Sequence, residues 1–334
     1  MRDIHDPNFI VNQLNGNLDM KLEVISYDEL LDKTNLAISD KVKSALFSTG
    51  IIGVRGVPTF LEKSLRYLEA VRRFVALDER IKHHYVPDRD AGLTEGYEVG
   101  AEQFQDHNGL WQTDDKKVSY YAFVPDHQRN KWPQEVDLKT PYLILGELMF
   151  NTGKQVLDLL GLNEVVGLDH DGLVGYGRML HYLKENSTQD TNPNWCGAHF
   201  DHGVFTALMP AYYFKDECEV EEPAEAGLFI RPVNSEHFEK VAENDKSVML
   251  FQVGEFAQLA SHDELRATKH LVRKSRANIE RFTFALFFSA RDDAMICPQS
   301  ILAKDTRFTA NQTADGTISY GAWEAASYER YRAR

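Results

Sequence analysis

Three side chains in the second half of the chain have the chemical types of a metal-binding set: His199, Asp201 and His270. One residue separates His199 from Asp201, and in an extended segment that spacing places both side chains on the same face. Two imidazoles and a carboxylate suit Fe(II), Mn(II) or Zn(II) better than Mg(II) or Cu(I), and on iron they leave adjacent positions open to small ligands. Open positions indicate a catalytic metal site rather than a structural one. For an isolated His-x-Asp pair, the alternative is an ordinary polar pair on a strand or a turn.

A guanidinium and a hydroxyl follow the third imidazole at the spacing of a carboxylate-binding pair. Arg281 and Thr283 are two residues apart in an apolar, alternating run that ends at Phe288. On a strand both side chains point to the same face, and a guanidinium offers parallel N–H donors to one carboxylate. The competing interpretation is an arginine at a strand edge that pairs with Glu280 or Glu264. The hydroxyl beside Arg281 favours the carboxylate site.

Taken together, these residues resemble the plant-type, or isopenicillin N synthase-like, family of Fe(II)/2-oxoglutarate-dependent dioxygenases. The resemblance spans nearly the whole chain. Further segments that carry it are Leu22–Ser26 with Ser44–Pro58, Glu95–Tyr97, Asn130–Pro133 and Val253–Ser261. In that order they are similar to the family's opening strand and helix with its Gly-Ile-Pro segment, its Gly-Tyr turn, its Asn-x-Trp-Pro element and the stretch before its distal histidine. Ile51 and Ile52 stand where the family usually has aromatic residues.

The resemblance also decides between two histidines for the third metal position. Aligned with the family, His270 occupies the distal position at the start of a strand, whereas His262 falls in the turn before it. The resemblance implies that His199, Asp201 and His270 hold Fe(II), that 2-oxoglutarate chelates the iron through its keto-acid end, and that O2 takes the last position. Oxidative decarboxylation to succinate and CO2 would be coupled to hydroxylation, desaturation or ring formation in a small-molecule substrate.

Three further side chains are implied to contact 2-oxoglutarate. In the family an Arg-x-Ser/Thr pair holds the far carboxylate, and here that role falls to Arg281 and Thr283. Tyr182 occupies the tyrosine position of the family's Asn-x-Tyr-Pro strand and is expected to donate a hydrogen bond to the same molecule. The chain departs from that motif at Leu180 and Leu183, where the family usually has Asn and Pro.

The substrate pocket is predicted from fewer residues. Candidates for its wall are Phe200, His202, Phe205 and Phe287, and packing in the core is the alternative for each. If Tyr182 points into a barrel, the two-residue period of a strand turns Arg178 inward as well. An inward guanidinium in an apolar barrel needs an anionic partner, so we predict a small, carboxylate-bearing substrate such as an amino acid or a peptide-like compound. An internal ion pair or a strand bulge would be the alternative explanation of Arg178.

Composition argues against several classes of protein. Acidic residues outnumber basic ones by 51 to 37, for a formal charge of −14, and because phosphate binding needs a basic footprint, nucleic acid is not an expected partner. Three cysteines without metal spacing predict neither a disulfide framework nor a zinc site and favour a cytoplasmic location. Residues 1–20 lack the apolar stretch of a secretory signal, and no segment is long and apolar enough to span a bilayer. The oligomeric state stays open.

Apolar periodicity predicts a mainly β protein with flanking helices. Helical spacing predicts helices over Asp28–Phe47, Thr59–His83 and Pro141–Leu162, the last of them ended by Gly161. Short apolar or alternating runs predict strands over Gly177–Leu183, Val204–Phe214, Ala226–Pro232, Val248–Val253, Phe256–Ala260, His270–Val272 and Phe282–Ser289. The acidic stretch Asp216–Glu225 is expected to be a surface loop, and the tail from Asn311 onward is expected to pack as a helix.

Several short strands in succession favour a sandwich, jelly roll or barrel over a parallel sheet, and the resemblance implies a double-stranded β-helix, or jelly-roll, core. With 334 residues the chain is expected to form a single dioxygenase domain. A helical and mixed N-terminal part would reach to about residue 165, the jelly-roll catalytic core would run from about 166 to 300, and a C-terminal tail would follow from about 301 to 334.

Three other functions remain open at this point. An oxidase of the same fold that does not use 2-oxoglutarate would keep the metal ligands but not the role of Arg281. A metal-dependent hydrolase would use the same three ligands to activate water. A non-catalytic small-molecule receptor would be expected to have lost a metal ligand, and none of the three is missing.

Overall fold

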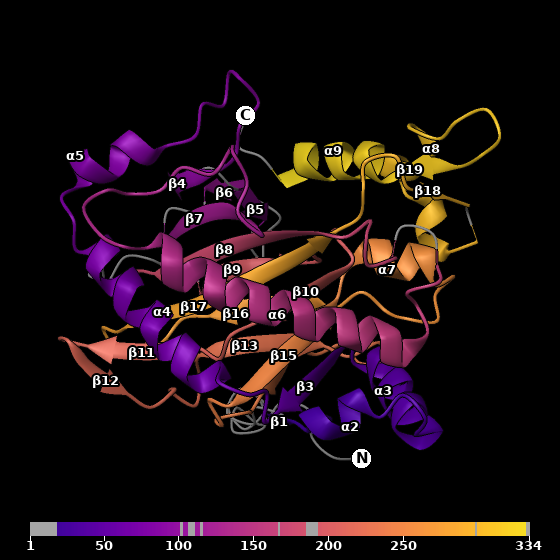
Figure 1. Ribbon diagram of the computed structural model, residues 1–334, viewed down its shortest axis with the longest axis horizontal. Coiled ribbons are helices and arrows are strands. Elements are labelled where there is room, and N and C mark those ends of the chain that lie inside the picture. The colour runs from indigo at the N-terminus through magenta and orange to yellow at the C-terminus, as the bar shows by residue number, and fades with distance from the viewer. Residues whose placement is uncertain are drawn as a thin grey trace, which may run out of the picture.

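Two β-sheets packed face to face form the centre of the molecule (Figure 1). The structure, a computed structural model, describes residues 19–100, 103–105, 111–113, 116–165, 168–184, 193–297 and 299–331. The prediction that residues 1–20 contain no secretory signal therefore lies almost entirely outside the described part of the chain.

The larger sheet combines strands from both halves of the chain. In spatial order its strands are β2 (Val24–Ser26), β3 (Ile51–Arg55), β15 (Val248–Val253), β10 (Phe205–Leu208), β17 (Glu280–Ser289), β8 (Val174–Tyr182), β7 (Lys117–Val124) and β4 (Gly96–Val99). A further strand, β11 (Tyr212–Lys215), pairs with the beginning of β17 and with the short β12 (Cys218–Val220). The N-terminal strands β2 and β3 are thus part of the same sheet as β8 and β17, which carry Tyr182 and Arg281.

The smaller sheet lies against the inner face of the larger one. Its strands in spatial order are β1 (Asp19–Met20), β14 (Glu239–Val241), β13 (Gly227–Arg231), β16 (Lys269–Arg273) and β9 (Asn194–His199). Apolar side chains of both sheets share the space between them: Tyr182 and Ala285 of the larger sheet belong to one buried cluster with Trp195 and Val272 of the smaller. This sandwich is the predicted jelly-roll core.

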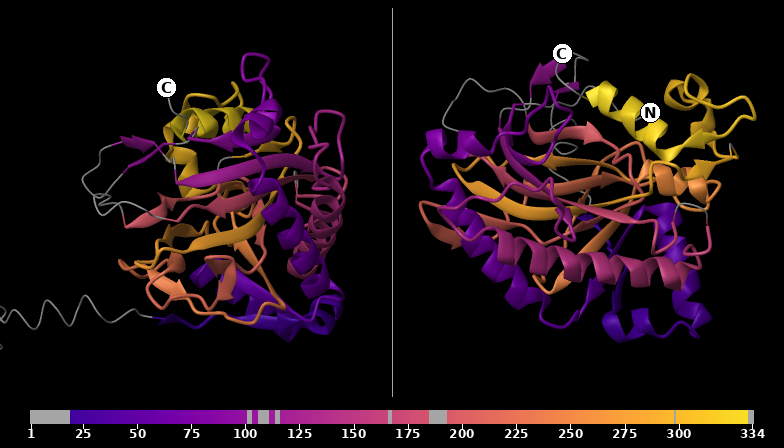
Figure 2. Two further views of the ribbon diagram at one scale, coloured as in Figure 1. Left: turned by 90° about the vertical axis from the view of Figure 1, so that its left-hand side faces the viewer. Right: turned by 45° about the horizontal axis from the view of Figure 1, so that its top comes forward.

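Helices α4 (Phe60–Val75) and α6 (Lys139–Leu160) cover the outer face of the larger sheet (Figure 2). Phe284 of β17 points toward them, because its ring centroid lies 4.8 Å from that of Tyr142 in α6 and 5.0 Å from that of Tyr67 in α4. Successive residues of a strand point to opposite faces, so the odd-numbered residues of β17, from 281 to 287, point inward between the sheets.

Both predicted N-terminal helices are interrupted. The first is divided into α2 (Tyr27–Leu31) and α3 (Leu36–Ser48), and the second into α4 and the short α5 (Glu79–Lys82), which the 3-10 turn η1 (His83–Tyr85) follows. At each break a new cap begins the next helix: the side chain of Asn35 accepts from the N–H of Ile38, and that of Asp78 from the N–H of Arg80. Such caps favour a new helix start although the apolar period continues across the break.

Most predicted strands are present, but two predictions differ from the structure. The run Val204–Phe214 is divided into β10 and β11 at Pro210, since proline cannot donate to a sheet ladder. The predicted strand Phe256–Ala260 is wrong, because this segment is the buried helix α7 (Glu255–Ala260). A short apolar run suits a buried helix as well as a buried strand, and the chain here leaves the sheet after β15.

Smaller elements complete the fold. The hairpin of β5 (Gln103–Gln105) and β6 (Trp111–Thr113), the pair β18 (Met295–Ile296) and β19 (Ile318–Ser319), and the helices η2 (Ile301–Lys304), α8 (Thr306–Thr309) and α9 (Tyr320–Tyr331) lie outside the two sheets. Helix α9 confirms the predicted helical tail, and α6 ends at Gly161 as predicted, with a φ of 68° that glycine adopts without strain. Among the described residues, no helix has the length and apolar character needed to cross a membrane. The single-domain organisation stays a prediction.

Candidate active site

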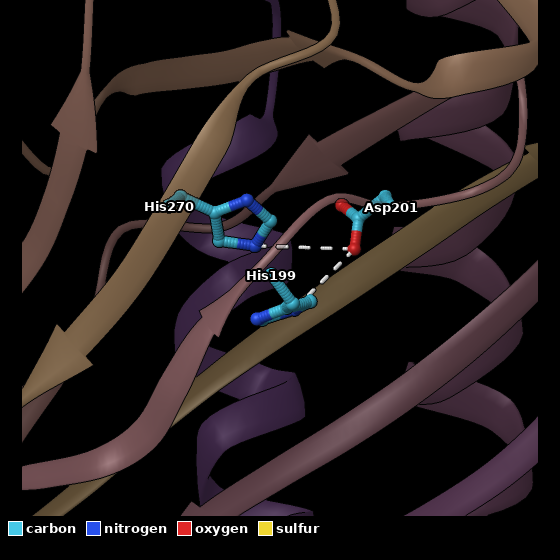
Figure 3. A group of neighbouring side chains, drawn as sticks. All are labelled: His199, Asp201 and His270. Carbon is cyan, nitrogen blue, oxygen red and sulfur yellow. Dashed lines mark ion pairs between the residues drawn. The ribbon is translucent and has the colours of Figure 1, made fainter. Parts of the chain in front are cut away.

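The three predicted metal ligands lie together (Figure 3). His199 ends β9 and is the cross-strand partner of His270 in β16, so their ring centroids are 4.2 Å apart. Oδ1 of Asp201 lies 3.6 Å from Nε2 of His199 and 3.9 Å from Nε2 of His270. One ligand atom from each residue lies within 4.8 Å of the others. The competing candidate, His262, is exposed in the turn after α7 and is not in this group.

Backbone carbonyl groups decide which nitrogen of each imidazole can bind a metal. Nδ1 of His199 lies 2.8 Å from the carbonyl oxygen of Gly197, and Nδ1 of His270 lies 3.0 Å from that of Thr268. A carbonyl oxygen only accepts, so each Nδ1 carries the hydrogen. Both Nε2 atoms therefore keep a lone pair on the side that faces Asp201, the tautomer that a metal ligand needs.

Asp201 is held by two side chains of the larger sheet. Its Oδ2 accepts hydrogen bonds of 2.6 Å from the Thr206 hydroxyl and of 2.6 Å from the Gln252 amide. Thr206 in β10 and Gln252 in β15 are cross-strand partners. Neither was a predicted site residue, although a buried polar side chain within an apolar strand was an available signal.

The ionisation of the group suits metal binding near neutral pH. Burial, assisted by the nearby His199, lowers the pKa of His270 to about 4, so that this imidazole is neutral. Burial alone would raise the pKa of Asp201, but His270, His199 and the two hydrogen bonds outweigh it, and the pKa lies below its ordinary value. A neutral imidazole and a carboxylate are the forms that coordinate metal.

The first turn of α7 fixes the loop that carries Asp201. The N–H of Glu255 donates to the carbonyl oxygen of Asp201 at 2.8 Å, and the N–H of Phe256 donates to that of Gly203 at 3.0 Å. A Cβ on Gly254 would lie 2.1 Å from the Gly203 carbonyl oxygen, so this close approach requires glycine. The segment wrongly predicted as a strand thus supports the loop of the candidate metal site.

A second polar cluster surrounds Arg281, which lies opposite Tyr182 in the pairing of β17 with β8. Both side chains are buried, 6% and 3% exposed, and the guanidinium carbon lies 4.9 Å from the centroid of the Tyr182 ring. Nε of Arg281 donates to the Tyr213 hydroxyl at 3.2 Å, while its buried Nη1 has no hydrogen-bond partner among the described residues. Glu280, the alternative partner, instead accepts from His181 at 2.6 Å. A carboxylate is the group that would satisfy such a nitrogen, so these residues fit the far end of 2-oxoglutarate.

Thr283 lies beside Arg281, but its hydroxyl is already engaged. Both residues line a cavity of about 40 Å³ together with Leu208 and Leu228. The Thr283 hydroxyl donates to the carbonyl oxygen of Met209 at 2.5 Å. Because a hydroxyl has a single hydrogen, Thr283 would have to release Met209 before it could donate to a carboxylate.

Comparison with known proteins identifies the architecture. No protein-family model matches the sequence, and no curated protein matches it. Solved structures do match: a full-length Neurospora crassa protein in complex with alpha-KG has a TM-score of 0.66 and 16% identity over 94% of this chain and 99% of that one. A protein from Caulobacter crescentus described as a member of the 2OG-Fe(II) oxygenase family has a TM-score of 0.68 and 16% identity over 92% and 98% of the two chains. This chain has the 2OG-Fe(II) oxygenase fold. JOX2 in complex with 2OG, Fe and JA shares it, with a TM-score of 0.63 and 14% identity over 95% and 92%.

Within this fold, Arg178 lies on β8 four residues before Tyr182, so both side chains point to the inward side of the strand. Its Nε donates to the Ser119 hydroxyl at 3.0 Å, and its guanidinium carbon lies 4.9 Å from the centroid of the Tyr121 ring. The Tyr121 ring stacks on that of Tyr176 at a centroid distance of 5.6 Å. Arg178 thus belongs to an aromatic wall of the sandwich.

The four residues predicted to line the pocket wall lie in different surroundings in this fold. The prediction that Phe205 lines the pocket wall is wrong. This side chain is 1% exposed, pairs with Phe288 and packs in the core on the helix side of the sheet. Phe287 is half-buried and points inward, because it pairs with Thr206, whose hydroxyl reaches Asp201.

The other two wall candidates flank Asp201 in the sequence. Phe200 is half-buried, with the amine of Lys269 5.8 Å from its ring centroid. His202 turns to helix α9: its ring centroid lies 4.7 Å from that of Tyr328, and its Nε2 lies 3.8 Å from a carboxylate oxygen of Glu324. His202 therefore joins the metal loop to the C-terminal helix.

Proposed function

We propose that this protein is an Fe(II)/2-oxoglutarate-dependent dioxygenase that couples oxidative decarboxylation of 2-oxoglutarate to oxidation of a small molecule. The observation that carries the proposal is the metal set itself. His199 and His270 present unprotonated Nε2 atoms to the same carboxylate oxygen of Asp201. Iron, when bound there with 2-oxoglutarate and O2, supplies the oxidising chemistry.

The protein's own residues bind and orient. Nε2 of His199, Nε2 of His270 and Oδ1 of Asp201 would hold the metal, and the remaining positions would stay open. The unpaired guanidinium nitrogen of Arg281 would bind the far carboxylate of 2-oxoglutarate. Tyr182, a buried phenol whose pKa burial raises to about 12, stays protonated and would donate a hydrogen bond.

The decisive experiment compares reactions with and without 2-oxoglutarate. Purified protein loaded with Fe(II) should consume O2 and release succinate only when 2-oxoglutarate is present. O2 consumption without 2-oxoglutarate would indicate the oxidase, and turnover under strict anaerobiosis would indicate the hydrolase.

We further propose that the substrate is a small molecule that carries a carboxylate. The half-buried guanidinium of Arg178 supports this, since it lies on the inward side between the level of Tyr182 and that of Phe287. Structures of the same fold hold small molecules: thymine in the N. crassa protein and JA in JOX2. In Arg178→Met the substrate KM should rise for acids, while 2-oxoglutarate turnover without substrate stays nearly constant. Equal loss of both would make Arg178 structural, and a preference of the wild-type enzyme for neutral or cationic substrates would rule the proposal out.

A cytoplasmic location is also proposed. Cys196, Cys218 and Cys297 form no disulfide in the described part of the chain, which supports a reducing compartment.

A further inference from the structure

A second buried cation lies in the same row of the larger sheet as Arg281. Lys117 in β7 pairs with Tyr182 in β8, and Tyr182 pairs with Arg281 in β17. Side chains of directly paired residues project to the same face, so all three point between the sheets. Lys117 is only 4% exposed, and lysine is rarely buried to this degree unless its charge is paired.

The ammonium of Lys117 reaches from the larger sheet toward the metal ligands. Its Nζ lies 3.6 Å from Sγ of Cys196 in β9, and that sulfur lies 3.9 Å from Nδ1 of His199. Lys117 therefore lies on the side of Tyr182 that faces β9, the strand that ends at His199.

Arg281 reaches the opposite way. Its Nε donates to Tyr213 in β11, the strand that borders β17 on the side away from β8. The two cations thus lie on either side of Tyr182, one next to the strand of His199 and one away from it. A dianion with a carboxylate at each end could contact both, one carboxylate to each cation.

We infer that Lys117 binds the carboxylate of 2-oxoglutarate next to the keto group, while Arg281 binds the far carboxylate. The inference rests on the proposed function. An ammonium has three N–H donors and acts as a compact charge, so its contact with the Cys196 sulfur does not exclude contact with a carboxylate. A charge-assisted hydrogen bond in this buried setting would both strengthen binding and orient the keto-acid end toward the metal.

Two ligands, 2-oxoglutarate and 2-oxovalerate, distinguish contacts at the two ends of 2-oxoglutarate. 2-Oxovalerate has the same carbon chain and keto-acid end as 2-oxoglutarate but lacks the far carboxylate. Binding of each would be measured by calorimetry on protein loaded with Mn(II) under anaerobic conditions, so that no turnover occurs. Lys117→Met should lower the affinity for both probes by a similar factor, on the order of tenfold or more. Arg281→Met should lower the affinity for 2-oxoglutarate by such a factor and leave the affinity for 2-oxovalerate unchanged.

Controls distinguish a binding role from a structural one. Lys215→Met removes an exposed lysine of β11 and should change neither affinity, and Lys117→Arg should retain most of both. If thermal unfolding shows that the Lys117→Met variant is not folded, Lys117→Gln replaces it in both binding measurements. Loss of 2-oxoglutarate binding alone would assign Lys117 to the far carboxylate, and unchanged binding of both probes would leave it no role; either result overturns the inference. A wild-type protein that binds Mn(II) but not 2-oxoglutarate would instead overturn the proposed function, and this inference with it.

Discussion

Each of the three proposed metal ligands is positioned by a partner outside that set. Gly197 and Thr268 accept from the two histidines, and Thr206 and Gln252 donate to Asp201. Partners of this kind fix the tautomer and the orientation of a ligand. Residue type, spacing and the family resemblance were enough to single out three side chains that the structure brings together. Their partners could not be predicted, because contact of Thr206 with Asp201 depends on how the chain folds back after β9.

Replacing His270 tests the choice between the two candidate histidines. His270→Ala removes one of three ligands, and protein reconstituted anaerobically should no longer retain Fe(II). His262→Ala removes an exposed side chain of the turn, and this variant should bind one equivalent, as is also expected of the wild type. Metal content after desalting is the measurement. Loss of metal from the His262 variant would contradict the assignment.

Thr206 offers a test of the hydrogen bonds that hold Asp201. Thr206→Val keeps the shape of the side chain but leaves Oδ2 with Gln252 alone, so metal affinity should fall by about 10- to 100-fold. Thr152→Val is a matched control, because this buried threonine of α6 donates to the carbonyl oxygen of Leu148 away from the metal group. Competition with a chelator measures both affinities, and equal values for the two variants would exclude a supporting role for Thr206.

The low pKa of His270 predicts how the metal-free protein responds to acid. Its pKa is lowered from 6.5 to about 4, so between these values the unfolded chain binds a proton that the folded chain does not. Stability therefore falls as the pH drops from about 6.5 to about 4, by about 3 kcal/mol from this residue. Urea unfolding across that range should show a shallower loss in His270→Gln. Parallel curves for the two proteins would mean that His270 is not buried as a neutral imidazole.

At the scale of elements, alternation predicts which residues of a strand share a face, but it does not say which face is inside. Arg281 and Thr283 share a face as predicted, and Phe205 was wrong because β10 turns that residue to the helices. Lys117 was missed because its row with Tyr182 and Arg281 exists only once β7, β8 and β17 are paired. Register between strands is set by tertiary packing.

A buried ion pair links the C-terminal segment to the helix that supports the Asp201 loop. Arg307 of α8 bonds both carboxylate oxygens of Glu255 in α7, at 2.5 and 2.8 Å, and the N–H of Glu255 donates to Asp201. Arg307→Met should cost about 3–5 kcal/mol, because it leaves a buried carboxylate unpaired, and should also weaken metal binding.

Arg330→Met is the matched control for that variant. Arg330 pairs with Asp305 at 3.1 Å while its side chain is 39% exposed, and exposed pairs contribute about 0–1 kcal/mol. Urea unfolding and metal affinity would be measured for both variants. If Arg307→Met kept its metal affinity while losing stability, the ion pair would serve the fold alone.

Across the whole molecule, the two faces of the larger sheet differ in role: the outer face packs against helices, and the inner face carries polar side chains of the proposed site. The outer face packs on α4 and α6 through aromatic residues such as Phe284 and Phe288. The inner face carries Tyr182 and Arg281 of the proposed 2-oxoglutarate site, and Thr206 and Gln252, which hold Asp201. This division explains how a chain only 14–16% identical to JOX2 and the N. crassa protein keeps their fold: apolar residues of suitable size can replace one another on the outer face.

Phe205 and Phe287, on opposite faces of neighbouring strands, test that division. Phe205→Ala opens a cavity in the helix-side core and should cost about 3–5 kcal/mol, because the side chain is 1% exposed. Phe287 is half-buried on the inner face, so Phe287→Ala removes less buried surface and should cost clearly less. Its effect should instead appear as a lower ratio of substrate oxidised to 2-oxoglutarate consumed, since Phe287 pairs with Thr206 beside the metal ligand. Urea unfolding gives the first quantity, and succinate release against product gives the second. A Phe287→Ala protein as unstable as Phe205→Ala, with unchanged coupling, would show that both faces serve stability and that the inner face does not contact the substrate at this position.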